Sequence, residues 1–600
     1  MKMSVADFIT EKMYEAGCEH VFLITGGMIM HLTDALLRNR KMKYICCHHE
    51  QAATMAAEAY GRYTGKLGVA YVTAGPGALN TITGAVGAYV DSSPCIIVAG
   101  QSKAALAKVK GVRQFPLQGF DNLPIFKHFT KYAVMLDDIS KVRYEVEKCI
   151  YMAKSGRVGP VYLECPIDVQ DMKFDPSEYK SFSPSACEKV KSEMSPRVMK
   201  AITDALLKSK RPCILAGAGV RLSGAIGLLH SFAEKAGIPV ITSRLGMDLM
   251  GFDHPLFVGH PGTYGDRPAN FAVQNCDLLL TIGCRLGVGL VGYDYGGFAP
   301  KALKIMVDID ETELTKPSVV PDIPVKADAA LFLKELIKRV PAKMAKNISW
   351  LERTWDWKDK YPVDLPEYAK EKNGINSYHF TRVLSDVMSD KDIFLVDTGS
   401  CFHVHAQAFK VKFGQRHIIT GGLSTMGYCP GSTGVAAAAG GRSVYCITGD
   451  GSLQMNLQEF QTVVHNKLPV KFIVSNNSGY LLIRLTQKNF CGGRLMGEGA
   501  DTGVSFPDLK KIAAAYGIPY LRIVKNSELK AKLEKLRAMR GPVICEVINP
   551  PFQLLIPRVA SKKLENGKMA SMPYDDMFPF LPREEYLANC APCECGGVKI

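Results

Sequence analysis

Two short motifs in the last third of the chain place oxygen atoms in a pattern that could hold a hard cation. GDGS, at 449–452, follows the apolar run SVYCIT, and NN, at 476–477, ends the next apolar run, VKFIVS. Because parallel strands bring their carboxyl ends to one edge of a sheet, we expect Asp450 and Asn477 to lie close together. Their side-chain oxygens and the backbone carbonyl of Gly479 are ligands that Mg²⁺ accepts, together with phosphate oxygens.

The same motif predicts an anion site beside the cation. Gly449, Gly451 and Ser452 stand where an apolar strand passes into a helix-like stretch. Backbone N–H groups at a helix start, together with the helix dipole, favour a group such as a diphosphate. A plain strand-to-helix turn also uses Gly and Asp. The asparagine pair after the next strand makes the cation and diphosphate site the favoured interpretation.

The elements that must position these residues alternate along the chain as apolar strands and helical periodicity. This alternation predicts an α/β protein with three doubly wound parallel-sheet domains, because each parallel strand needs a helical crossover. The expected strands of the first domain are KYICC, LGVAYVTAG, CIIVAGQ and GPVYLECP. Those of the second are RPCILAGAG, IPVITS, CDLLLTIG and LKIMVDID, and those of the third are DIFLVDTG, SVYCITGDG, VKFIVSNN and PVICEVI. The expected divisions are 1–175, a linker at 176–197, 198–342, a second linker at 343–375, 376–555, and a tail at 556–600.

Composition narrows the class of protein. The chain of 600 residues has 73 Lys and Arg against 58 Asp and Glu, a net charge of +15. The basic residues are scattered and no nucleic-acid-binding motif accompanies them, so we expect no nucleic acid partner. The amphipathic start and the lack of an apolar run of about 18 residues predict no signal peptide and no membrane span, hence a cytoplasmic protein. Cys95, Cys213, Cys446 and Cys545 lie in apolar runs and are expected to be buried and reduced.

Two long segments resemble one enzyme family. HHEQAATMAAEAYGRYTGKLGVAYVTAGPGALN, starting at 48, and STMGYCPGSTGVAAAAGGRSVYCITGDGS, at 424–452, are similar to the thiamine diphosphate enzymes of the acetolactate synthase, pyruvate oxidase and pyruvate decarboxylase group. The acetolactate synthase pattern is the nearest. The resemblance implies a pyrimidine-binding first domain, a central domain like those that bind FAD or nucleotides, and a third domain that binds diphosphate and Mg²⁺.

The resemblance implies roles for individual residues. Glu50 is the family's catalytic carboxylate, which acts on the aminopyrimidine ring of the cofactor from a water-poor pocket. Met426 matches the apolar residue beneath the cofactor, and backbone groups of Ser424 and Met426 would bond the pyrimidine edge. Gln118 joins Glu50 and Met426 as an expected catalytic residue.

Weaker matches line the expected cofactor pocket. Thr73 and Asn80 come from TAGPGALN, and His403 matches a diphosphate-binding histidine of the family. Phe402 stands where the family has a glutamine, so part of that contact is in doubt. His405 has no counterpart and is interpreted as a core or surface histidine.

The central domain contains glycines and charges in the order of a flavin-binding domain. Gly217 and Gly219 would let backbone approach a dinucleotide phosphate, Arg221 and Arg285 would pair with it, and Asp308 or Asp310 would accept from ribose or adenine groups. Relatives with this domain exist both with and without FAD, and the run LGVGLVG after GCR departs from the charged run of acetolactate synthases. Both alternatives stay open.

The departures from the family bear on the reaction. Simple decarboxylases carry a second glutamate where Ile483 stands. Without a proton donor there, a carbonyl acceptor can capture the decarboxylated fragment, which favours a carboligase acting on a 2-keto acid and a 2-keto acid or keto-sugar acceptor. A decarboxylase, a pyruvate oxidase and a non-catalytic nucleotide-binding homologue are the alternatives. Because the cofactor bridges two domains, which belong to different subunits in the family, a homodimer or homotetramer is implied.

Overall fold

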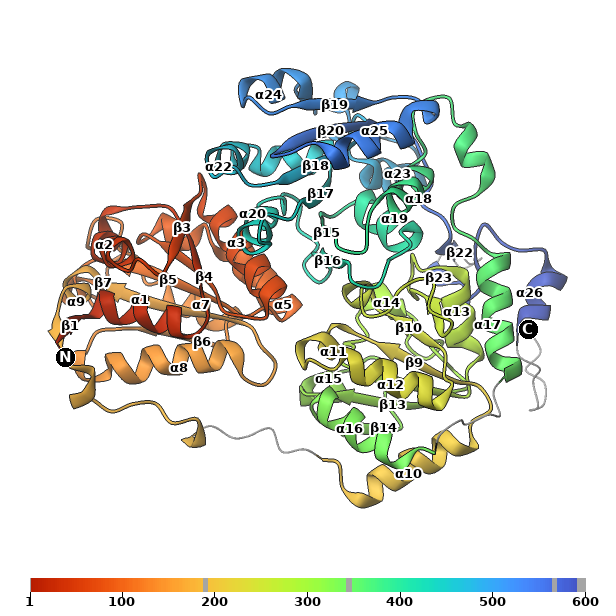
Figure 1. The fold of residues 1–600 in the computed structure, drawn as a ribbon, viewed down its shortest axis with the longest axis horizontal. Helices are drawn as coiled ribbons and strands as arrows, with labels where there is room; N and C mark the ends of the chain where they lie inside the picture. The colour runs from red at the N-terminus through yellow and green to blue at the C-terminus, as the bar shows by residue number, and fades with distance from the viewer. Residues whose placement is uncertain (1, 187–192, 342–347, 564–568, 591–600) are drawn as a thin grey trace. The chain divides into compact units, whose positions relative to one another are not determined.

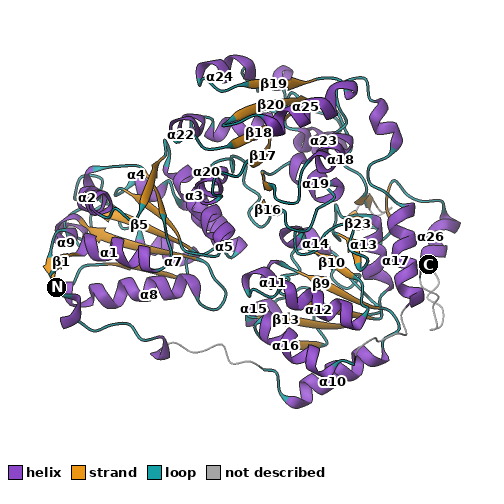
Figure 2. Cartoon of the chain, viewed as in Figure 1, coloured by secondary structure: helices purple, strands orange, loops and turns teal. Residues whose placement is uncertain are grey.

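The computed structural model describes residues 2–186, 193–341, 348–563 and 569–590. It contains three six-stranded sheets in which every paired strand is parallel, and helices flank each sheet (Figures 1 and 2). This confirms the predicted fold class. The chain groups into two compact units: the first holds the amino-terminal and carboxyl-terminal sheets, and the second holds the central sheet with residues 403–415 and the tail.

The amino-terminal and carboxyl-terminal sheets share one topology. Numbered within each sheet, both have the strand order 2-1-3-4-6-5. The first contains β2 (His20–Leu23), β3 (Lys43–Cys46), β4 (Gly68–Val72), β5 (Cys95–Gln101), β6 (Tyr132–Met135) and β7 (Pro160–Pro166). The other contains β15 (Ile393–Val396), β16 (Arg416–Ile419), β17 (Val444–Gly449), β18 (Val470–Asn476), β19 (Tyr520–Ile523) and β20 (Val543–Ile548). The order reverses between the first and third strands, where ligands of open parallel sheets bind.

The helices of these two domains are mostly amphipathic covers. Those of the first are α1 (Val5–Glu15), α2 (Met30–Arg38), α3 (Glu50–Thr64), α5 (Ile82–Asp91), α7 (Leu123–Phe129) and α8 (Val142–Lys154). Those of the carboxyl-terminal domain include α20 (Gly431–Ala438), α21 (Asp450–Leu453), α22 (Glu459–His465), α23 (Leu481–Phe490), α24 (Leu509–Ala515) and α25 (Asn526–Ala538). α19 (Ser400–Ala408) follows β15.

α3 is a nearly all-buried helix rich in alanine, and it packs on α20 within the first unit. A side chain at Gly434 would come within 1.9 Å of the Ala56 carbonyl oxygen, and one at Gly431 within 3.1 Å of the Ala59 methyl carbon. Only small residues on both helices allow this approach. The packing places the amino-terminal end of α3 in the same unit as the GDGS motif.

The central sheet has the strand order 3-2-1-4-5-6, which is the order of dinucleotide-binding sheets. Its strands are β9 (Pro212–Ala216), β10 (Val240–Thr242), β11 (Phe257–Gly259), β12 (Leu278–Ile282), β13 (Leu303–Asp308) and β14 (Ile323–Lys326). Its helices include α10 (Pro196–Lys208), α11 (Ala218–Leu222), α12 (Ile226–Ala236), α13 (Arg267–Asn275), α15 (Glu311–Thr315) and α16 (Ala329–Arg339).

The second connector holds a helix that the sequence analysis did not foresee. α17 (Ile348–Lys360) buries Trp350, Thr354 and Trp357, which share one face, and the indole of Trp350 donates to the Pro212 carbonyl at 3.0 Å. The tail also folds onto this unit, where α26 (Arg583–Asn589) accepts a hydrogen bond of 2.8 Å from Trp357 at Asn589. The terminal thiols Cys593 and Cys595 lie outside the described residues.

The structure bears on the expectations for the cysteines and for membrane-spanning segments. Cys95, Cys213, Cys446 and Cys545 are free and buried, as predicted. Among the helices that the structure describes, none is both long and apolar enough to cross a membrane.

Candidate active site

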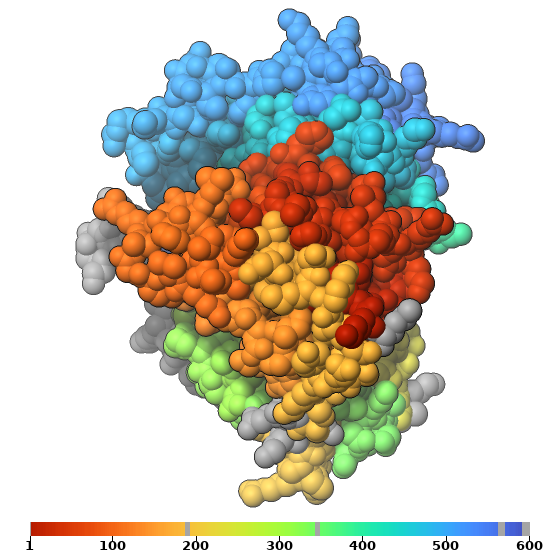
Figure 3. Space-filling model, turned by 90° about the vertical axis from the view of Figure 1, so that its left-hand side faces the viewer, coloured from red at the N-terminus to blue at the C-terminus, as the bar shows by residue number. Residues whose placement is uncertain are grey.

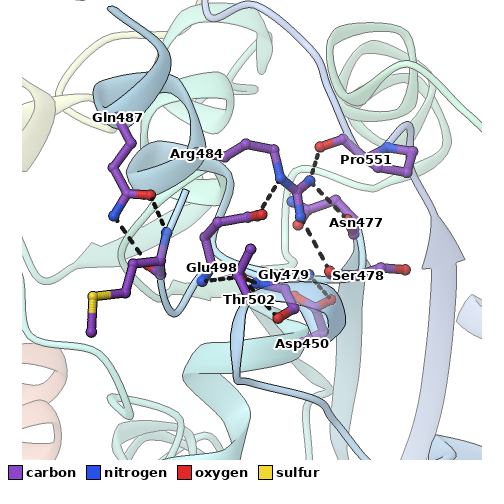
Figure 4. Close-up of polar contacts among 11 residues, drawn as sticks. Asp450, Asn477, Ser478, Gly479, Arg484, Gln487, Glu498, Thr502 and Pro551 are labelled. Atoms are coloured by element: carbon purple, nitrogen blue, oxygen red, sulfur yellow. Dashed lines mark hydrogen bonds and ion pairs between the residues drawn. The ribbon is translucent and has the colours of Figure 1, made fainter. Parts of the chain in front are cut away.

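Two strand ends of the carboxyl-terminal sheet meet at the predicted cation site (Figure 4). Asp450 begins α21 directly after β17, and its two carboxylate oxygens accept hydrogen bonds from the backbone N–H groups of Gly451 at 3.0 Å and Gly479 at 3.1 Å. The second contact spans two strands, because Gly479 follows β18. The structure therefore brings Asp450 and the Asn477–Gly479 turn together at one edge.

The donor set at this edge fits a divalent cation. The side-chain oxygen of Asn477 is buried and has no hydrogen-bond partner among the described residues. Asp450 is 3 % exposed, and burial raises the pKa of its carboxyl group to about 6, a rise that the N–H of Gly479 opposes. A buried polar oxygen without a partner and a buried carboxylate both cost free energy that a bound cation would offset. Together with the Gly479 carbonyl they form an oxygen-only ligand set.

Packing also requires a glycine at position 451 of the GDGS turn. A side chain at Gly451 would come within 2.3 Å of the Tyr480 ring. Gly449 is the N-cap of α21, and the backbone there is extended. The backbone N–H of Ser452 lies in the first turn of this short helix. The sequence analysis predicts that this N–H faces a diphosphate. That contact stays a prediction.

A buried aspartate that the sequence analysis did not single out organises the turn. Asp397, just after β15, accepts a hydrogen bond of 2.6 Å from the hydroxyl of Ser452 and one of 2.9 Å from Thr448. The Ser452 hydroxyl in turn accepts from the backbone N–H of Gly427 at 2.8 Å. Ser452 therefore ties the Met426 loop to the strand end. The sequence feature that could have identified Asp397 is its position as a polar residue at the end of an apolar strand.

The loop that carries Ser424 and Met426 is held from the amino-terminal domain. Its start is fixed by the carboxylate of Asp91, which accepts hydrogen bonds from the N–H groups of Gly421 at 3.1 Å and Gly422 at 2.8 Å. Ser424 has a left-handed backbone (φ 53°), and Met426 is half-buried. The structure describes no cofactor contact for either residue, so their roles stay predictions.

Glu50 is the first residue of α3, and His49 is the N-cap, whose ring nitrogen accepts from the Gln51 N–H at 3.0 Å. The Asn80 amide donates to a Glu50 carboxylate oxygen at 3.0 Å. A side chain at Gly77 would lie 3.4 Å from the other oxygen and 2.8 Å from Thr73. The structure thus gathers Glu50, Thr73 and Asn80, as the sequence analysis expected of one pocket.

The Thr73 hydroxyl is buried without a hydrogen-bond partner among the described residues, and it follows β4 at the reversal of strand order. Gln118 is exposed and has a left-handed backbone (φ 56°). Its carbonyl oxygen packs against Gly75, where a side chain would come within 2.2 Å of it. Gln118 therefore lies beside the TAGPG turn that carries Thr73.

Contacts near both ends of α3 join the two domains of the first unit. The backbone N–H of His48 donates to the Glu459 carboxylate at 2.9 Å, and the His48 ring lies 3.1 Å from the Thr462 hydroxyl. Arg62 donates to the Ile419 carbonyl at 2.8 Å. The segment around Glu50 is thus fixed against the domain that carries Asp450.

His403 belongs to the second unit. The guanidinium of Arg244 donates to its Nδ1 at 3.2 Å, and the Tyr264 ring lies over it with centroids 4.4 Å apart. Burial, and then the charge of Arg244, lowers the pKa of His403 to about 3. The ring is therefore neutral and carries its proton on Nε2. A diphosphate contact through that nitrogen stays a prediction. His405 is 1 % exposed and stacks on Phe409, which fits the expected core histidine.

The central glycines serve the fold directly. A side chain at Gly217 would come within 2.2 Å of the Gly283 carbonyl oxygen, and one at Gly219 within 2.7 Å of the Gly283 α-carbon. Because glycine has no side chain, the turn after β9 can approach the end of β12 closely. The strand order reverses between these two strands. Close packing is one of the roles of glycines in dinucleotide-binding turns.

The charged residues of the central domain make protein contacts. Arg221 pairs with the buried Asp248 at 2.9 Å. Asp308 accepts from the Asp310 N–H at 3.0 Å, and Asp310 caps α15 through the Thr312 N–H at 3.0 Å. Arg285 accepts a hydrogen bond from Lys316 at its backbone carbonyl. Their expected contacts with a nucleotide stay predictions.

Comparison with known proteins decides the family. Three sequence models match: the thiamine pyrophosphate enzyme N-terminal TPP binding domain at residues 3–125, the central domain at 199–336 and the C-terminal TPP binding domain at 397–547. The chain belongs to the thiamine pyrophosphate enzyme family. This cofactor is the thiamine diphosphate of the sequence analysis, so the resemblance is confirmed, and the chain is an enzyme of this kind.

Relatives of similar length agree with this assignment. A protein of Methanocaldococcus jannaschii named as a probable acetolactate synthase large subunit is 33% identical over 92% of this chain and 93% of its own length. The acetolactate synthase large subunit of Cyanidium caldarium is 32% identical over 92% of this chain and 94% of its own. That of Buchnera aphidicola from Schizaphis graminum is 32% identical over 88% and 91%. This thiamine pyrophosphate enzyme is therefore similar to them over nearly its whole length.

Proposed function

We propose that the chain is a thiamine diphosphate-dependent carboligase. It would decarboxylate a 2-keto acid such as pyruvate and transfer the acyl fragment to a carbonyl acceptor, either a 2-keto acid or a keto-sugar. The observation that carries the proposal is the buried Asn477 oxygen, which has no partner in the described part of the chain and lies in the turn whose Gly479 N–H bonds Asp450, at a sheet edge of a thiamine pyrophosphate enzyme. The names of the acetolactate synthase relatives support carbon–carbon bond formation.

The chain's own residues would divide the work between two domains. Asp450, Asn477 and the carbonyl of Gly479 would hold Mg²⁺, which in turn binds the diphosphate. When bound, thiamine diphosphate supplies the nucleophilic carbon and takes up the electrons released by decarboxylation. Glu50, oriented by the Asn80 amide at 3.0 Å, would exchange a proton with the pyrimidine ring.

Two features favour carboligation over simple decarboxylation. Ile483, where decarboxylases carry a glutamate, is an apolar side chain that cannot donate a proton. Simple decarboxylases also use a pair of adjacent histidines as proton donors, and His48 and His49, which precede Glu50, belong to a different segment. His49 caps α3, and His48 lies 3.1 Å from the Thr462 hydroxyl. Without the proton donors of a decarboxylase, the decarboxylated fragment stays available to a carbonyl acceptor.

Product analysis tests the proposal. The purified chain is incubated with pyruvate, thiamine diphosphate and Mg²⁺, alone and with 2-keto acid or keto-sugar acceptors, and the products are identified by mass spectrometry. We expect CO₂ release together with a ligated product. Acetaldehyde as the sole product would establish a decarboxylase, and acetate formed with O₂ consumption an oxidase. Either outcome overturns the carboligase.

FAD is proposed as a second cofactor, bound by the central domain. The strand order 3-2-1-4-5-6 and the close turn at Gly217 support a dinucleotide at the edge between β9 and β12. An absorbance spectrum of the purified chain, followed by chromatography of the released cofactor, tests this. Colourless protein that takes up no added FAD would contradict it.

A homodimer or homotetramer is proposed as the working assembly. The amino-terminal domain faces the viewer in Figure 3. One of its segments exposes apolar side chains, which a second copy would cover. These side chains are Val112, Phe115, Leu117 and Phe120. Light scattering after size-exclusion chromatography measures the assembly. A monomer at micromolar concentration in the presence of cofactor would refute it.

A further inference from the structure

Arg484 reaches back from α23 onto the turn that ends β18. It lies in the first turn of the helix, where side chains point toward the helix start. Its guanidinium donates to the carbonyl oxygens of Asn477 at 3.4 Å, Ser478 at 3.3 Å and Pro551 (Figure 4). One buried side chain therefore binds two successive carbonyls of the turn that carries Asn477 and Gly479.

Glu498 holds Arg484 in this position. Its carboxylate accepts from the Nε of Arg484, and its backbone carbonyl accepts from the Tyr480 N–H at 2.8 Å. Both side chains are buried, with Glu498 5 % and Arg484 9 % exposed. A buried ion pair adds little net stability, because both charges lose their hydration, so its effect is chiefly to fix geometry.

The charges also suit a cation nearby. A guanidinium without a counter-ion would repel a divalent cation at the adjacent turn, and the Glu498 carboxylate neutralises it. The Thr502 hydroxyl accepts a hydrogen bond of 3.0 Å from the Glu498 N–H, so the backbone that carries this carboxylate is itself anchored. The pair can therefore bind the turn without adding net positive charge.

The contacts with Arg484 fix the direction of two peptide groups in the Asn477–Gly479 turn. With the Asn477 and Ser478 carbonyls directed at Arg484, the turn cannot rotate those oxygens toward Asp450. The Ser478 carbonyl and the Gly479 N–H belong to one planar peptide group, so directing its oxygen at Arg484 turns its N–H the opposite way, where Asp450 accepts it at 3.1 Å. The Asn477 side-chain oxygen has no hydrogen-bond partner among the described residues. We propose that Arg484, held by Glu498, is the positioning residue that fixes the Asn477–Gly479 turn for a divalent cation. This inference rests on the proposed function.

Calorimetry on the full-length apo protein tests it. Mg²⁺ is titrated at a fixed excess of thiamine diphosphate, for wild type and for Arg484→Gln. We expect the apparent dissociation constant for Mg²⁺ to rise ~10–100-fold, as for other residues that orient metal ligands, with kcat near wild type once Mg²⁺ saturates. Arg484→Lys should recover part of the affinity, since it keeps the charge but not the fork of donors.

Arg143→Gln is the matched control. Arg143, in α8 of the amino-terminal domain, also donates to a glutamate, Glu147 at 3.2 Å, and to two backbone carbonyls. Its loss should leave Mg²⁺ affinity unchanged. If Arg484→Gln does not fold, Glu498→Gln carries the test, and it should also weaken Mg²⁺ binding.

The outcomes separate this inference from the proposed function. Folded Arg484 or Glu498 variants that bind Mg²⁺ as wild type does would overturn the positioning role. A loss of activity that excess Mg²⁺ does not restore would also overturn it, because that indicates general damage. Wild type that binds thiamine diphosphate equally well without any divalent cation would instead remove the cation site of the proposed function.

Discussion

The side-chain amide of Asn456 donates a hydrogen bond of 3.1 Å to the side chain of Gln51, the residue that follows Glu50. The same amide donates to the Gly427 carbonyl at 2.6 Å, just after Met426. One buried side chain thus connects the start of α3 with the loop beneath the expected cofactor site. Because Asn456 is 2 % exposed, water cannot easily replace it.

Replacing Asn456 with alanine should lower kcat roughly tenfold, since a lost link of about 1–2 kcal/mol loosens Glu50 relative to Met426. Steady-state kinetics with pyruvate measures this, and KM should change less than kcat. Asn466→Ala is the control, because the Asn466 amide bonds the Thr462 carbonyl of the helix that it follows. Equal kcat in wild type and Asn456→Ala would show that this link has no role in catalysis.

Glu50→Gln should retain cofactor binding and reduce turnover by roughly 10²–10⁴, because the amide keeps the shape of the side chain but cannot exchange a proton. Turnover and calorimetric binding of thiamine diphosphate are measured on the same preparation. Glu19→Gln is the matched control, since Glu19 pairs with Lys66 at the surface. Undiminished turnover in Glu50→Gln would exclude Glu50 from the reaction.

Asp450→Ala should abolish Mg²⁺-dependent binding of thiamine diphosphate, because it removes the only carboxylate among the three expected ligands. Removal of the cation from wild type with a chelator should release the cofactor in the same way, and added Mg²⁺ should restore it. Asp501→Asn, at an exposed position, serves as control. Normal Mg²⁺-dependent affinity in Asp450→Ala would place the cation elsewhere.

His260 should make the protein less stable in mild acid. Burial lowers its pKa from 6.5 to about 4, so between these values the unfolded chain binds more protons than the folded one. Stability therefore falls as pH decreases through this window, by ~2 kcal/mol from this group between about pH 7 and about pH 5.

Thermal midpoints at the two pH values, for wild type and His260→Gln, measure the effect of His260. The fall on acidification should be smaller in His260→Gln, whatever its absolute stability. His465→Gln, at an exposed histidine, should behave as wild type does. An identical pH dependence in wild type and His260→Gln would show that His260 is not responsible.

Strands that the sequence analysis missed lie mainly at sheet edges. In the central and carboxyl-terminal sheets, the four inner strands of each sheet were predicted. The edge strands were not: these are β11 and β14 in the central sheet and β16 and β19 in the carboxyl-terminal sheet. Inner strands are buried on both faces and read as continuous apolar runs, whereas edge strands are shorter and partly polar. The amino-terminal sheet differs, because there both β2 and the edge strand β6 were missed.

Residues close in sequence to a strand end could be predicted, because the ends of parallel strands meet wherever the sheet forms. The GDGS and NN motifs, and with them the closeness of Asp450 and the Asn477–Gly479 turn, were determined in this way by sequence alone. So was the family, through segments that resemble it. Partners that meet only through the packing of helices and loops could not be predicted: Asp91 with Gly421, and Arg484 with Glu498. Their contacts depend on how helices and loops pack, and in an alternating α/β chain only the tertiary structure decides which polar side chains become buried together.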